Sequence, residues 1–106
     1  KLDEQELPYE AHQASAHKQI NALLKILDEN VNNRCLFITV AGLSNALSGV
    51  VAGYTNRPVI SCPPFKDNVD MSINLASSMQ CPSKVPVMTI LNPTNVAISC
   101  RRIFDL

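Results

Sequence analysis

The sequence predicts an α/β domain in which a mostly parallel β-sheet lies between helices, in a three-layer αβα sandwich. Short apolar runs typical of strands alternate regularly with longer segments in which apolar residues recur at helical spacing. Regular alternation of this kind implies right-handed crossovers and a sheet covered on both faces. With 106 residues, the chain is long enough for one domain, which we expect to span residues 1–106.

Four strands are expected from runs that glycine, proline or polar residues bound, at 7–14, 35–41, 58–62 and 85–91. The run at 35–41 is almost continuously apolar, which suits a parallel strand covered on both faces. Pro8 suits a first strand position, and Pro86 favours an edge or an end position because proline has no N–H for the ladder.

Four helices are expected, at about 18–29, 45–52, 68–79 and 93–104. In the first, Ile20, Leu23, Leu24 and Leu27 recur at the spacing of one buried helical stripe. The last begins at Asn92-Pro93, a capping residue followed by a proline at the first helical position.

Composition argues against several classes of partner. Nine basic and nine acidic residues give a formal net charge of zero, whereas nucleic acids and anionic membranes normally need a basic surface. No apolar run approaches the roughly 20 residues that span a bilayer. The polar residues 1–7 do not form a signal peptide, and the first residue is not Met, so we expect the chain to begin inside a longer protein.

The four cysteines have neither metal-finger nor redox-motif spacing. Cys35 and Cys62 lie in strand-like runs, and Cys100 lies on an apolar helix face. Buried thiols in a reducing, cytoplasmic compartment are therefore expected.

The expected architecture places a ligand site in the crevice beyond the carboxyl ends of the strands. Two loops there, 14–18 and 41–45, lead directly into helix N-termini, where free backbone N–H groups favour anions.

His17, beside Lys18, is the candidate for proton transfer, because an imidazole has an unperturbed pKa of about 6.5. A surface histidine beside a lysine explains the same pair equally well. His12 and His17 could bind a metal only with further ligands; none stands out, so no zinc site is expected.

The segment Gly42-Leu43-Ser44-Asn45 has two interpretations. A glycine break followed by a serine cap would suffice for it. Alternatively, its N–H groups and polar side chains face a carboxylate or CO2. The segment 61–64, Ser-Cys-Pro-Pro, could likewise be only a strand stop.

Three segments stand in the order found in one enzyme family: Ser15-Ala16-His17-Lys18, Ala41 to Leu47 and Pro58 to Pro64. Together they resemble the class II aminoimidazole ribonucleotide (AIR) carboxylase family, and residues 90–91 and 96–106 are similar to its animal members. The resemblance extends over nearly the whole chain and implies a flavodoxin-like, doubly wound fold.

The resemblance implies a carboxy-lyase of purine biosynthesis. Members reversibly carboxylate AIR with CO2 to carboxyaminoimidazole ribonucleotide (CAIR), using neither ATP nor biotin, so no cofactor is expected. It further implies a homo-octamer with active sites between subunits. In animal enzymes a SAICAR synthetase domain precedes this domain on the same chain.

The family pattern also implies roles for individual residues. His17 would be the general acid/base, since a carbon of the substrate's imidazole loses or regains a proton. Ser15 and Lys18 would hold the phosphate or carboxylate, and Gly42, Ser44 and Asn45 would form the polar wall for CO2 or the carboxylate.

The chain departs from the family pattern in three places. The family's first strand, its glycine-serine-aspartate loop and most of the helix that follows have no counterpart here, and residues 1–7 resemble the end of that helix. Because that strand lies in the middle of related sheets, the chain alone is expected to be inactive and unstable. Leu43 replaces a usual arginine, and Gln19-Ile20-Asn21 replaces a small and an acidic residue.

Two other functions remain open at this point. The departures favour, as the alternative, a degenerate carboxylase-like domain that serves oligomerisation. A flavodoxin-like signalling module is less favoured, because receiver-type domains need acidic residues clustered at strand ends and this chain has none.

Overall fold

The computed structural model describes residues 1–13, 19–41, 46–64 and 81–106. The described strands are β1 (Phe37–Thr39), β2 (Val59–Ser61) and β3 (Met88–Thr89). They form one sheet in the order β1-β2-β3, and both neighbouring pairs are parallel. The predicted parallel sheet is thus confirmed.

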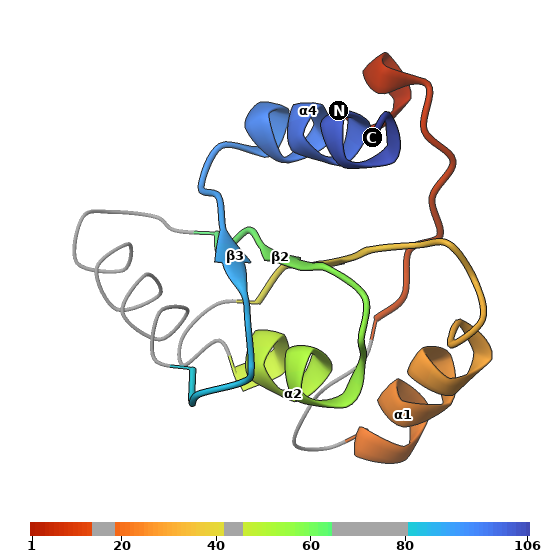
Figure 1. Cartoon of the computed structure of the whole chain (residues 1–106), viewed down its shortest axis with the longest axis vertical. Coiled ribbons are helices and arrows are strands. Elements are labelled where there is room, and N and C mark those ends of the chain that lie inside the picture. Colours follow the sequence, from red (N-terminus) through yellow and green to blue (C-terminus); the bar gives the residue numbers. More distant parts are fainter. Residues whose placement is uncertain (14–18, 42–45, 65–80) are drawn as a thin grey trace.

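The described helices lie on both faces of the sheet (Figure 1). They are the short 3-10 helix η1 (Asp3–Gln5) and the α-helices α1 (Ile20–Glu29), α2 (Ala46–Tyr54) and α4 (Pro93–Phe104). In Figure 1, α1 and α2 lie below the sheet, and α4 lies above it beside η1. The helix predicted at 68–79 lies outside the described residues. No described helix is long and apolar enough to cross a membrane.

Each face of the sheet has its own apolar core. On one face, Leu23 and Leu27 of α1 pack with Val51, Ala52 and Val59. On the other face, the core consists of Ile60, Cys62, Val96 and Cys100. Consecutive residues of β2 enter opposite cores, as expected for a strand covered on both faces.

The predicted start of the last helix is confirmed in its atomic detail. The Asn92 side-chain oxygen accepts a hydrogen bond from the Thr94 N–H over 2.9 Å, and Pro93 is the first helical residue. The spacing of α4 predicts a buried stripe, and three of its members, Val96, Ala97 and Cys100, are buried. Ile103 and Phe104, which the spacing places on the same stripe, are only partly buried in the last turn. Local sequence chemistry therefore determines where this helix begins and which side faces the sheet.

One predicted strand is wrong over its described part. Residues 7–13 belong to no strand, although 7–14 has a strand-like composition. A strand needs a neighbour to accept and donate its backbone hydrogen bonds, and β1 at the edge of the sheet does not pair with this segment. The prediction at 85–91 is confirmed only over Met88–Thr89.

None of the four cysteines, all of which lie in described ranges, forms a disulfide. Cys62 and Cys100 are buried as predicted, while Cys35 is only partly buried.

Candidate functional site

The three parallel strands end at the same edge of the sheet. Thr39, the last residue of β1, is opposite Ser61 of β2, and Ser61 is opposite Thr89 of β3. The backbone ladder continues one step further: the Cys62 N–H donates to the Thr39 carbonyl and the Ile90 N–H to the Ser61 carbonyl, each over 2.9 Å. In open parallel sheets ligands bind beyond this edge.

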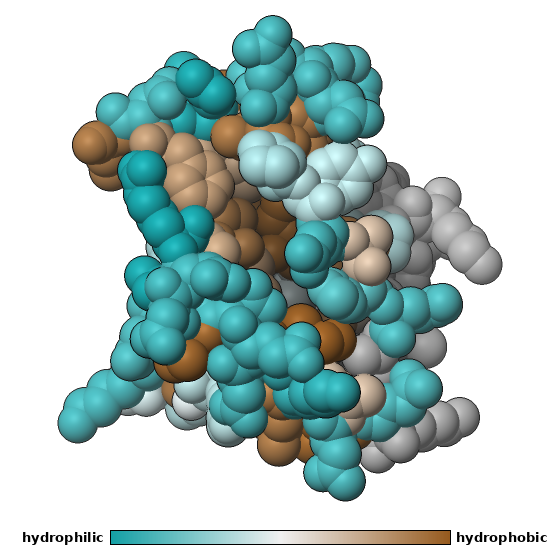
Figure 2. Space-filling view, turned by 90° about the vertical axis from the view of Figure 1, so that its right-hand side faces the viewer, coloured by the Kyte–Doolittle hydropathy of each residue, from teal (hydrophilic) through white to brown (hydrophobic). Residues whose placement is uncertain are grey.

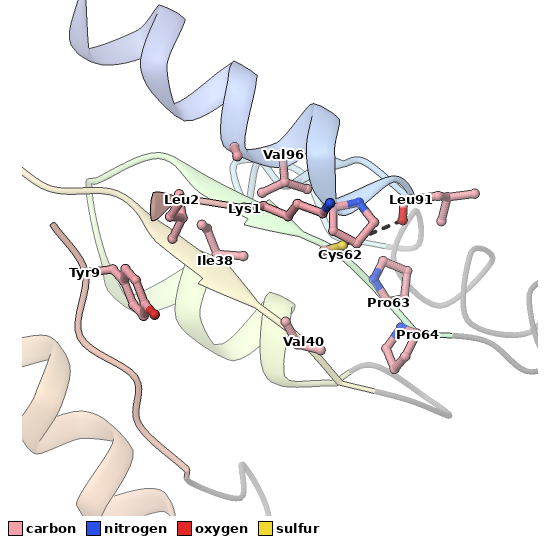
Figure 3. A pocket seen from close by; sticks show the side chains of 12 residues that line it. Lys1, Leu2, Tyr9, Ile38, Val40, Cys62, Pro63, Pro64, Leu91 and Val96 are labelled. Atoms are coloured by element: carbon pink, nitrogen blue, oxygen red, sulfur yellow. Dashed lines mark hydrogen bonds between the residues drawn. The ribbon is translucent and has the colours of Figure 1, made fainter. Parts of the chain in front are cut away.

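A cavity of about 520 Å³ lies at this edge, between the strand ends and the first turns of α4 (Figure 3). Ile38 and Val40 of the β1 segment form one wall, and Val96 and Ala97 of α4 form another. The other lining residues are Lys1, Leu2, Tyr9, Cys62, Pro63, Pro64, Leu91 and Pro93. Ligand sites in proteins are commonly lined in this way, mostly by apolar side chains.

Cys62 brings a thiol to this cavity, but its surroundings make it a structural residue. Its Sγ donates to the Leu91 carbonyl, 3.7 Å away, which links the ends of β2 and β3 (Figure 3). Burial raises the pKa of the Cys62 thiol. The thiol therefore stays protonated near neutrality, and a protonated thiol is a poor nucleophile.

A buried hydroxyl pair links the end of β1 to α2. The Thr39 and Ser48 hydroxyls are 2.7 Å apart, and both residues are buried. Because an unsatisfied buried hydroxyl is costly, this hydrogen bond fixes α2 against the end of β1. The described residues on both sides of 42–45 are thus held together at the carboxyl edge.

His12, the one histidine among the described residues, lines neither the cavity at the carboxyl edge nor the Thr39–Ser48 pair. Its Nε2 lies 3.3 Å from the Glu10 carboxylate, and both side chains are exposed. This contact is a solvated surface pair.

All the site residues predicted from the sequence lie outside the described residues: Ser15, His17, Lys18, Gly42, Ser44 and Asn45. Leu43 does as well. The described residues nearest to them along the chain are Gln13 and Gln19, which flank the first loop, and Ala41 and Ala46, which flank the second. The roles given to the six residues therefore stay predictions.

Sequence reasoning missed the Thr39–Ser48 pair and the Cys62–Leu91 link. Thr39 interrupts an apolar strand and Ser48 interrupts an apolar helix. Polar residues at positions that the pattern buries are the signal for such a pair, since buried polar groups need partners.

Comparisons with known proteins point to the same family as the three sequence segments 15–18, 41–47 and 58–64. The family model described as AIR carboxylase matches residues 1–106. The phosphoribosylaminoimidazole carboxylase of Archaeoglobus fulgidus is 42% identical over 93 residues, which is 88% of this chain and 51% of that protein. A bifunctional phosphoribosylaminoimidazole carboxylase/phosphoribosylaminoimidazole succinocarboxamide synthetase of Drosophila melanogaster is 39% identical, over 94% of this chain and 24% of that protein.

Among solved structures, the crystal structure of Treponema denticola PurE matches with a TM-score of 0.90 and 35% identity. The match covers 98% of this chain and 66% of that chain. The chain therefore spans between 24% and 66% of the length of these relatives.

Proposed function

Because the chain belongs to the AIR carboxylase family, we propose that it provides the larger part of a phosphoribosylaminoimidazole carboxylase domain. The reaction is the reversible carboxylation of AIR with CO2 to CAIR in purine biosynthesis, without ATP, biotin or another cofactor. The observation that carries the proposal is the family match over residues 1–106, on a chain whose described strands end together at one edge.

The chemistry of this reaction suits the residues that the sequence places at that edge. Carboxylation forms a C–C bond between an imidazole carbon and CO2, and that carbon then loses its proton. His17 accepts the proton in this direction and returns it during decarboxylation. Ser15 and Lys18 hold the phosphate or carboxylate, and Gly42, Ser44 and Asn45 hold the CO2 or the new carboxylate.

The described cavity supports this assignment through its lining. Ile38, Val40, Val96 and Ala97 make an apolar wall beside the strand ends. Such a wall keeps water away from CO2 between its release and its recapture.

The same proposal includes the oligomeric state, the compartment and a neighbouring domain. The domain forms a homo-octamer in the cytoplasm, with sites between subunits. The printed name of the Drosophila relative combines a carboxylase with a succinocarboxamide synthetase. A similar fusion to a SAICAR synthetase domain is proposed for this chain.

The test is turnover by a completed domain. The chain is joined to the part of the Treponema denticola relative for which it has no counterpart, and CAIR decarboxylation is followed by ultraviolet absorbance. We expect turnover. A folded octamer without turnover that also fails to bind AIR in calorimetry would instead establish a degenerate domain serving oligomerisation.

In the same completed domain, His17→Asn should lower the decarboxylation rate by about 10²–10⁴-fold, the usual contribution of general acid–base catalysis. His12→Asn is the matched control, because His12 is exposed and its only described partner is Glu10. A retained rate in His17→Asn would remove His17 from its proposed role.

A further inference from the structure

The face of the sheet that α2 covers changes from apolar to hydroxylic at the carboxyl edge. Phe37 of β1 and Val59 of β2 are opposite each other, and both belong to the core that α1 and α2 cover. Side chains two residues further along a strand return to the same face. On this face the next opposite pair is Thr39 and Ser61, and both are buried. Buried hydroxyls thus replace apolar side chains where the strands end.

Thr39 is held by contacts to two different elements. Its carbonyl accepts from the Cys62 N–H over 2.9 Å, which ties the end of β1 to β2. Its hydroxyl is 2.7 Å from that of Ser48, in the first turn of α2. Thr39 also borders a hollow of about 940 Å³ beside β1, with Leu47 and Val51 in the lining and hydrophobic atoms at its floor (Figure 2). In such apolar surroundings a hydrogen bond between hydroxyls is strong, and the loss of one partner is costly.

The Thr39–Ser48 pair spans one of the two loops of the proposed site. Thr39 precedes Ala41, the last described residue before 42–45, and Ser48 follows Ala46, the first described residue after them. The hydrogen bond therefore sets the separation of the two chain ends between which residues 42–45 run. The other loop, 14–18, belongs to a different connection, from residues 7–13 to α1.

On the basis of the proposed function, we propose that Thr39 and Ser48 are positioning residues for CO2. Neither touches the substrate. Their hydrogen bond holds the two ends of 42–45, so that Gly42, Ser44 and Asn45 meet CO2 already in place. A segment that is ordered only when its ligand binds lowers the affinity, because the ordering costs free energy.

A positioning role and a merely structural role differ in their kinetic signatures. The phosphate of AIR is assigned to Ser15 and Lys18, which lie in the other loop. Loosening the ends of 42–45 should therefore raise the KM for CO2 and leave the KM for AIR unchanged. A pair that only stabilises the fold would instead change the fraction of active enzyme, which lowers kcat and leaves both KM values as they are.

The test uses the completed domain described above, with carboxylation of AIR followed by ultraviolet absorbance. AIR and CO2, supplied as bicarbonate, are varied separately. Thr39→Val removes the hydroxyl and keeps the shape of the side chain. It should raise the KM for CO2 roughly fivefold, the usual contribution of one hydrogen bond, and change kcat and the KM for AIR by less than about twofold. Thr39→Ser keeps a hydroxyl and should restore the KM for CO2 to within about twofold.

Two further variants show whether the effect belongs to this pair. Thr55→Val is the matched control: Thr55 follows the other end of α2, and its hydroxyl oxygen accepts from the Arg57 N–H over 3.1 Å. It should leave both KM values unchanged. Ser48→Ala should raise the KM for CO2, and the double variant with Thr39→Val should be no worse than the worse single variant, because the two residues act through one hydrogen bond.

Amide hydrogen exchange in the same completed domain separates this proposal from the proposed function. Thr39→Val should speed exchange in residues 40–48 by at least about fivefold and leave α4 unchanged, whereas Thr55→Val should not speed it there. If the completed domain does not turn over, the proposed function fails, and exchange still decides whether the pair holds this segment. Unchanged exchange, an unchanged KM for CO2, equal rises in both KM values or the same effect in Thr55→Val would each overturn the positioning role.

Discussion

At the scale of single residues, two polar contacts fix helices in place: the Asn92 cap of α4 and the Thr39–Ser48 hydrogen bond beside α2. Asn92 and Pro93 predict a helix start, and in the structure the Asn92 side chain accepts the expected capping hydrogen bond from the Thr94 N–H. Thr39 and Ser48 are nine residues apart, and their hydrogen bond depends on how α2 packs against β1. The local patterns show that each is a polar residue at a buried position, but they do not show that the two residues are each other's partner. His17 and its five companions are recognisable only as parts of motifs, because each has a sufficient structural explanation by itself.

The four thiols should differ in reactivity. Cys62 and Cys100 are buried, and burial raises the pKa of each, so both remain protonated where an exposed thiol begins to ionise. In mass-spectrometric labelling with iodoacetamide near pH 8, the partly exposed Cys35 and Cys81 should be modified first. Equal rates at all four thiols in the folded protein would contradict the described core.

The same shifts give a pH dependence of stability. A thiol whose pKa is higher in the folded state stabilises the fold fully below its unfolded pKa of about 8.5. This contribution is lost as the pH rises through the folded-state value. The free energy of unfolding, measured with urea, should therefore fall above about pH 8.5, and Cys100→Ala should reduce that fall.

At the scale of elements, periodicity and capping predicted the described α-helices well. α4 begins at its predicted proline. α1 buries Leu23 and Leu27 of the predicted stripe, whereas Leu24 is only partly buried and Ile20, in the first turn, is exposed. Strands were harder to predict from the sequence than helices. Residues 7–13 have a strand-like composition but no ladder, because whether a segment becomes a strand depends on a neighbour elsewhere in the chain or in another chain.

The cap of α4 offers a test at this scale. Asn92→Ala removes the side-chain oxygen that accepts from the Thr94 N–H, while the exposed side chain leaves no cavity behind. The loss should lower the free energy of unfolding by about 0.5–2 kcal/mol. Asn92→Asp, which keeps an acceptor, should cost much less. Equal losses in urea denaturation would show that the cap does not stabilise α4.

At the scale of the whole molecule, the predicted three-layer architecture is confirmed, with α1 and α2 on one face and α4 on the other (Figure 1). The alternation of segments predicted this arrangement because crossovers in parallel sheets have one handedness. It could not predict the cavity at the carboxyl edge, since a cavity depends on the spacing between packed segments.

The central claim is that the carboxyl edge of this sheet binds the carboxylase substrate. It is tested most directly by a crystal structure of the completed domain with CAIR bound. We expect the ligand beyond the ends of β1 and β2, with its carboxylated carbon beside His17. A side-chain nitrogen of His17 should lie within about 2.6–3.2 Å of a group of the ligand. CAIR bound elsewhere, with the edge vacant and His17 turned away, would contradict the account.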